Sequence, residues 1–155
     1  MALETVLAAR ALLETATPLH ADCGRVCGAA CCEGSDSDGM LLFPGEEALY
    51  RGCAFGRARR LPYALGGRPA RLFVCRGTCP RQARPLSCRI FPARFLPGGD
   101  IAMDARARGL CPIYGSGLTG LAPEFREAAR KAAALLARDA ECRAFLEDLD
   151  AEFRL

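Results

Sequence analysis

Histidine is nearly missing from this sequence of 155 residues, in which His20 is the only one. A single histidine excludes a histidine-rich catalytic zinc site. The sequence also lacks a glycine-rich cofactor fingerprint between a strand and a helix, and it has no nucleophile signature or motif of paired catalytic carboxylates. The missing nucleophile and carboxylate motifs argue against ordinary hydrolysis, and the sequence leaves open whether the protein is an enzyme.

Long apolar runs are missing as well. No window approaches the roughly 20 apolar residues that a membrane span needs, so no membrane partner is expected. The first twenty residues carry Glu4, Arg10 and Glu14 among their apolar residues, unlike the uninterrupted core of a secretory signal. We therefore expect a cytoplasmic protein, in which cysteine thiols stay reduced.

The ten cysteines are too few for a typical disulfide scaffold of this length. About half of the residues are apolar, so a hydrophobic core can form without disulfides. We expect one domain, spanning residues 1–155. Clustered cysteines in a reducing compartment predict metal ligands or redox groups before they predict disulfides.

Acidic residues are missing from one third of the chain. Residues 51–99 hold eleven arginines and no Asp or Glu, although the formal net charge of the whole chain is only +3. One interpretation is that the arginines compensate bound thiolates and cover the surface; the other is a groove for nucleic acid. We favour the first, because aromatic residues are sparse in this block and no nucleic-acid motif is present.

Helices are expected at both ends of the chain. Apolar residues recur at helical spacing in residues 3–15, before Pro18 ends the run. A longer helical pattern follows Pro123 and extends over about residues 123–153, where Asp139 interrupts the apolar stripe and predicts a break into two helices.

The middle of the chain gives a weaker pattern. Residues 51–97 are rich in Gly, Pro and Arg, and they suggest irregular polypeptide around ligands. A short helix is expected after Gly45, and short strands are expected at residues 40–43, 72–74 and 101–103. The predicted fold class is α+β, mostly α, with terminal helices, little strand and irregular cysteine-rich loops around a metal site.

The cysteines form two groups. The first group is Cys23, Cys27, Cys31 and Cys32; the second is Cys75, Cys79, Cys88 and Cys111. Zinc takes four ligands in a tetrahedron, and iron–sulfur clusters take four thiolates. The eight thiols could therefore form two four-coordinate sites, or one cluster, including a 4Fe–4S cluster, with spare thiols.

The remaining cysteines are ambiguous to different degrees. Cys53 lies between the two groups, and the sequence leaves open whether it packs or binds metal. Cys142 lies on the apolar stripe of the last helix, which predicts a buried core thiol. His20, three residues before Cys23, could be a ligand or a residue at a helix end.

Three segments resemble the YkgJ-type cysteine-cluster family. They are the block Cys23–Cys32, the run MLLFPGEE at residues 40–47, and RPLSCRIFP at residues 84–92. Together they cover about residues 23–112. The usual family signature is C-x2-C-x2-C-C followed by Arg-Pro-x-x-Cys-Arg, whereas this chain has three residues in each of the first two gaps. The resemblance implies a domain that chelates zinc or iron.

The function expected from the sequence is therefore binding of zinc or an iron–sulfur cluster through cysteine thiolates. Two alternatives stay open: an iron–sulfur enzyme or electron carrier, and a zinc-stabilised module that binds nucleic acid or another partner.

Overall fold

The computed structural model describes residues 2–18, 39–75, 81–108 and 114–153. Its α-helices are α1 (Ala2–Leu12), α3 (Leu86–Ile90), α4 (Pro123–Arg138) and α5 (Ala140–Phe153). Its strands are β1 (Met40–Leu41), β2 (Gly56–Leu65), β3 (Arg68–Cys75), β4 (Ala93–Phe95) and β5 (Ile101–Met103). Short 3-10 helices are η2 (Glu46–Tyr50), η3 (Arg81–Ala83), η4 (Ala105–Ala107), η5 (Tyr114–Ser116) and η6 (Leu118–Gly120).

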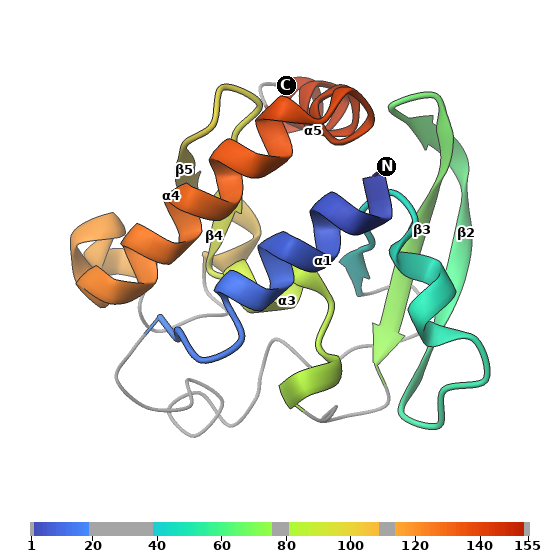
Figure 1. Ribbon diagram of the computed structural model, residues 1–155, viewed down its shortest axis with the longest axis horizontal. Coiled ribbons are helices and arrows are strands. Elements are labelled where there is room, and N and C mark those ends of the chain that lie inside the picture. Colours follow the sequence, from blue (N-terminus) through green and yellow to red (C-terminus); the bar gives the residue numbers. More distant parts are fainter. Residues whose placement is uncertain (1, 19–38, 76–80, 109–113, 154–155) are drawn as a thin grey trace.

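An antiparallel sheet with the strand order β1-β3-β2 forms one side of the molecule (Figure 1). Its longest part is the hairpin of β2 and β3, which turns at Gly66 and Gly67. Both glycines have positive φ, 63° and 78°, as a two-residue hairpin turn of this kind requires. A second, two-stranded sheet joins β4 to β5.

The expectation of a mostly α fold with little strand is wrong. Strands hold about 22% of the described residues, and the hairpin occupies much of the segment that was expected to be irregular. The alternation of apolar and polar residues is hidden there for a physical reason. Most of β2 is exposed or half-buried on both faces, whereas the second half of β3 is largely buried on both faces, so neither strand shows a clean period of two.

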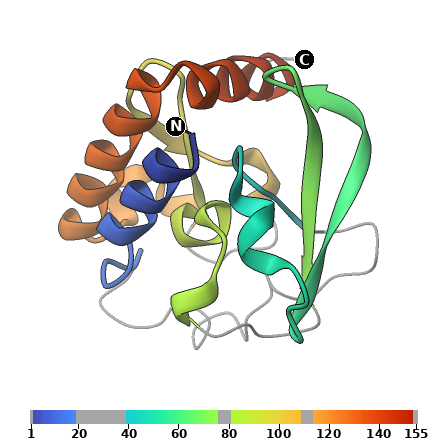
Figure 2. The ribbon, with the colours of Figure 1, turned by 45° about the vertical axis from the view of Figure 1, so that its right-hand side comes forward.

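The core lies between the helices and the sheet. Helix α1 lies alongside α4, and the hairpin stands on the other side of the molecule (Figures 1 and 2). Val6 of α1 and Phe125 and Leu136 of α4 are fully buried in one cluster with Leu72 and Val74 of β3. The apolar faces of the terminal helices thus pack against one another, and α5 also contacts β2, within a core that includes residues of β3.

The predicted break at Asp139 is confirmed. Asp139 has extended backbone angles, φ −88° and ψ 122°, and it ends α4. Its Oδ1 then accepts the N–H groups of Glu141 and Cys142, both at 3.0 Å, as the capping residue of α5. The short strands expected near residues 40–43 and 101–103 are also present, as β1 and β5.

Candidate metal-binding site

Two of the eight predicted metal ligands, Cys75 and Cys88, are among the described residues. The other predicted ligands lie outside them, as does His20: they are Cys23, Cys27, Cys31, Cys32, Cys79 and Cys111. The site can therefore be built from the two described thiols and from the elements that position them.

Cys75 is the last residue of β3. Its half-buried side chain packs against a cluster of three buried residues, Leu42, Tyr50 and Phe73. The backbone of Cys75 is held opposite Gly56, the first residue of β2. The sheet thus fixes this thiol at one end of the hairpin.

Cys53 lies at the same corner of the sheet. It packs against the same buried cluster as Cys75, and its thiol donates a hydrogen bond to the carbonyl of Gly56 at 3.4 Å. Because Gly56 pairs with Cys75, the hairpin places both cysteines beside one glycine. The sequence could not show this, because the pairing of β2 with β3 was not predicted.

Cys88 comes from α3 and is also half-buried. It packs with Met40, Phe91 and Ala107 on the side of β1. It also lines a small pocket together with Arg84 and Arg89, with about 20 Å³ of space, enough for one water molecule. The two arginines that flank Cys88 in the sequence therefore lie beside it in the structure.

A buried ion pair fixes the segment that carries Cys88. Glu46 is fully buried, and its Oε2 lies 2.7 Å from the Arg10 guanidinium of α1. The same carboxylate accepts the N–H of Leu86, at 2.7 Å, and the N–H of Phe43, at 3.0 Å. Burial raises the pKa of Glu46, and these three donors act in the opposite direction. One carboxylate thus ties α1, the turn after β1 and the start of α3 together.

Tyr50 extends this network. Its hydroxyl accepts a hydrogen bond from Arg10 at 2.8 Å and donates one to the carbonyl of Ala83 at 2.6 Å. Burial and the negative charge of Glu46 raise the pKa of Tyr50 above its ordinary value, and a thiolate at Cys88 acts in the same direction. Tyr50 therefore stays a neutral hydroxyl that can donate, and its ring packs beneath Cys75.

Arg89 closes the loop around Cys88. Its three guanidinium nitrogens donate to the backbone carbonyls of Arg84 (2.9 Å), Arg10 (3.1 Å) and Gln82 (2.7 Å). Burial, together with the nearby positive charge of Arg10, lowers the pKa of Arg89. Arg89 thus holds the backbone that precedes Cys88, at Gln82 and Arg84, against the end of α1.

The arginine block is compensated in part by acidic residues of α5. Arg68 forms an ion pair with Glu141, and Arg94 forms one with Asp150 at 2.9 Å. Two of the eleven arginines in residues 51–99 are therefore paired with acidic residues of α5. The sequence had suggested that these arginines compensate bound thiolates and cover the surface.

Cys142 is a core residue, as predicted. Its side chain is 0% exposed. Burial and the nearby charge of Asp139 raise its pKa to about 12. A thiol that stays protonated is a poor metal ligand, because ligation requires the thiolate.

No group of three or more His, Cys, Asp or Glu side chains that could hold a metal ion occurs among the residues the structure describes. Thiolates in general are ligands for soft metals such as zinc and iron. The structure places Cys53 and Cys75 against one buried cluster and Cys88 against another. No helix in the same part of the chain is long and apolar enough to cross a membrane.

Comparison of the chain with protein-family models, with curated proteins and with solved structures finds no match. The resemblance to the YkgJ-type family therefore rests on the three sequence segments alone and stays a prediction.

Proposed function

We propose that this protein binds zinc or an iron–sulfur cluster through cysteine thiolates. The observation that supports the proposal best is the way in which Cys88 is held. Three hydrogen bonds fix the segment Arg84–Arg89. The N–H of Leu86 donates to the Glu46 carboxylate, and the Arg89 guanidinium donates to the carbonyl of Arg84. The Ser87 hydroxyl donates to the carbonyl of Leu41 at 2.5 Å. Cys88 lies at the centre of this framework.

The framework is costly for a purely structural loop. Removing Arg10 and Glu46 from water costs several kcal/mol per ion, and their mutual attraction offsets that cost only when the remaining hydrogen bonds are made. A buried pair of this kind therefore contributes more to a defined geometry than to stability. A metal site benefits from such a geometry, because ligands held on fixed backbone need less ordering when the metal binds.

Cys75 supports the same proposal from the end of β3. It ends a strand whose preceding residues are buried, so its position is fixed by the core. Cys79 follows four residues later, and Cys53 lies at the same corner. Several thiols within reach of two fixed points suit a metal that joins distant segments, so that its binding energy becomes folding energy.

The test is anaerobic purification followed by elemental analysis and a visible spectrum. We expect zinc or iron, and a brown iron–sulfur chromophore would distinguish a cluster from zinc. Cys75→Ser and Cys88→Ser should each lower the metal content. Cys142→Ala is the matched control; it should retain the metal while losing some stability, because its thiol packs in the core. Folded protein with less than about a tenth of an equivalent of any transition metal would contradict the proposal.

A further inference from the structure

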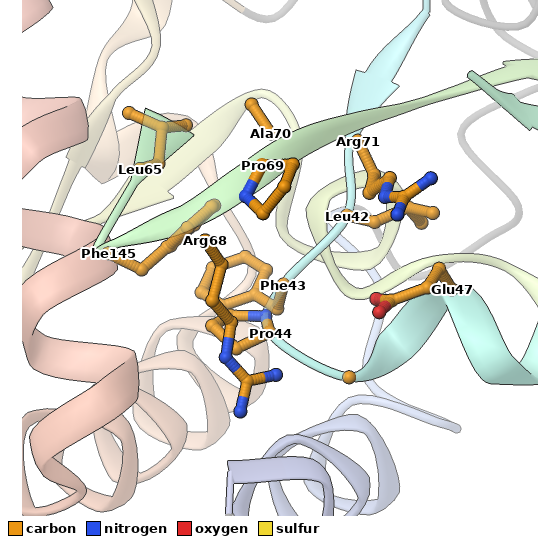
Figure 3. A pocket seen from close by; sticks show the side chains of 11 residues that line it. Leu42, Phe43, Pro44, Glu47, Leu65, Arg68, Pro69, Ala70, Arg71 and Phe145 are labelled. Carbon is orange, nitrogen blue, oxygen red and sulfur yellow. The ribbon is translucent and has the colours of Figure 1, made fainter. Parts of the chain in front are cut away.

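A second pocket lies far from the cysteines, at the Arg68 end of β3 (Figure 3). It has a volume of about 240 Å³ and lies between the turn after β1, the start of β3 and α5. Cys75 is at the opposite end of the same strand. The pocket is thus separate from the candidate metal site, and a ligand bound in it would be independent of the proposed function.

The short length of β1 creates this pocket. β1 pairs with β3 only at Met40 and Leu41, and Leu42 adds one hydrogen bond to the carbonyl of Arg71, at 2.9 Å. The chain then turns away through Gly45, whose φ is +85°. Among the described residues, no strand covers Arg68–Ala70 on this side of β3, and Pro69 has no N–H to offer to one.

Apolar side chains form one part of the pocket. The rings of Phe43 and Phe145 lie 4.8 Å apart between their centroids, and both residues are buried. Leu65, Pro69 and Ala70 complete this surface. An apolar group of a ligand would therefore meet preformed packing surface, without rearrangement of the core.

Charged side chains of both signs line the rest of the pocket. Arg68 is already paired with Glu141. Glu47 and Arg71 are half-buried and line the same pocket, yet neither side chain has a hydrogen bond or ion pair with any described residue. Figure 3 shows the Glu47 carboxylate directed into the pocket and Arg71 beside Leu42. Two opposite charges thus share one pocket without meeting each other.

We propose that this pocket binds a small zwitterion with an apolar side chain, of the class of free α-amino acids. The Arg71 guanidinium would donate hydrogen bonds to the ligand carboxylate, since the two groups match geometrically. Glu47 would receive the ammonium, and the apolar side chain would lie against Phe43 and Phe145. The volume is below the usual 300 to 1,000 Å³ or so of drug-sized pockets, which suits a ligand of amino-acid size.

The test compares four probes by NMR titration of the full chain. L-leucine should give saturable shifts of the backbone amides of Gly45, Arg68 and Ala70. N-acetyl-leucine lacks the ammonium, leucinamide lacks the carboxylate, and glycine lacks the side chain. Each should bind at least about tenfold more weakly than leucine, as expected for the loss of one charge-assisted hydrogen bond or of one apolar side chain.

Two variants test which side chain of the pocket binds the ammonium of the ligand and which binds its carboxylate. Glu47→Gln should remove the preference for leucine over N-acetyl-leucine, and Arg71→Gln should remove the preference for leucine over leucinamide. Arg60→Gln is the matched control, because Arg60 lies directly opposite Arg71 in the sheet but does not line the pocket; it should leave both preferences unchanged. The proposal is overturned by shifts that do not saturate at about 10 mM leucine, by saturable shifts confined to other residues, or by equal binding of leucine and leucinamide to the native chain.

Discussion

Glu46 and Glu47 are neighbours in the chain, but they lie in two different regions of the molecule. Glu46 points into the interior, where it is 0% exposed and receives three hydrogen-bond donors. Glu47 lines an open pocket and has no hydrogen-bonding or ionic partner among the described residues. The comparison shows how one turn can supply both a fixed structural charge and a free one. Glu46 holds the backbone at Phe43 and at Leu86, two residues before Cys88, whereas Glu47 faces the pocket.

The largest difference should appear when each carboxylate is neutralised. Glu46→Gln leaves the Arg10 guanidinium buried without a counter-ion, which typically costs about 3–5 kcal/mol of unfolding free energy. Glu47→Gln should change it by less than about 0.5 kcal/mol, because no partner is lost. Chemical denaturation of both variants measures the difference. Equal effects would show that the two carboxylates do not differ in the way the structure describes.

A second comparison uses the arginines of the two regions. Arg89→Met removes three hydrogen bonds to backbone carbonyls and should cost about 2 kcal/mol. Arg71→Met should cost less than about 0.5 kcal/mol, since its guanidinium has no partner among the described residues.

Metal content gives an independent readout of the same pair of variants. If Arg89 positions Cys88, Arg89→Met should lower the metal content even under conditions where the protein stays folded, and Arg71→Met should not. Full metal content in folded Arg89→Met would show that the loop around Cys88 needs no such support.

A third comparison removes one hydroxyl from the inner region and one from the exposed surface of the hairpin. Tyr50→Phe deletes an acceptor for Arg10 and a donor to the carbonyl of Ala83, and it should cost about 1–2 kcal/mol. Tyr63 is 48% exposed on β2, and Tyr63→Phe should be neutral within about 0.5 kcal/mol. Thermal unfolding of the two variants, compared with the native chain, measures both; a neutral Tyr50→Phe would remove Tyr50 from the network.

The terminal helices could be predicted from the sequence, because each buries one continuous stripe at helical spacing. The break at Asp139 could be predicted for the same reason, since one polar residue interrupts the stripe. The hairpin could not, because its strands lack a clean alternation. Its one clear sign was the Gly66-Gly67 pair between two segments of β-forming residues, and the density of arginine obscured that sign.

Part of the candidate site could likewise be predicted from the sequence, and part of it could not. Cys75 and Cys88 could be proposed from spacing and from a motif, because cysteine has few other uses in this pattern. The network of Arg10, Glu46 and Tyr50 could not, since nothing local distinguishes Glu46 from Glu47. Which of the two is buried depends on the direction in which the chain leaves β1, and this direction is set by the tertiary packing of α1 and α3.

Asp139 is a third carboxylate. It accepts hydrogen bonds, as Glu46 does, but it has no buried arginine beside it in the described part of the chain. The pH dependence of unfolding tests how much its charge contributes to stability. Partial burial raises its pKa, but donors from Cys142, Glu141 and Thr5 outweigh that effect, so its pKa in the folded protein is lowered. A lowered pKa contributes stability that is present above the unfolded pKa of about 3.9 and is lost as the pH falls through the folded pKa.

Asp139→Asn retains a capping side chain but not the charge, so it should cost less than about 1 kcal/mol at neutral pH. Denaturation of both proteins at a series of pH values should show that this difference shrinks as Asp139 becomes protonated. A difference that stays constant down to about pH 2.5 would mean that the cap acts through its geometry alone and not through its charge.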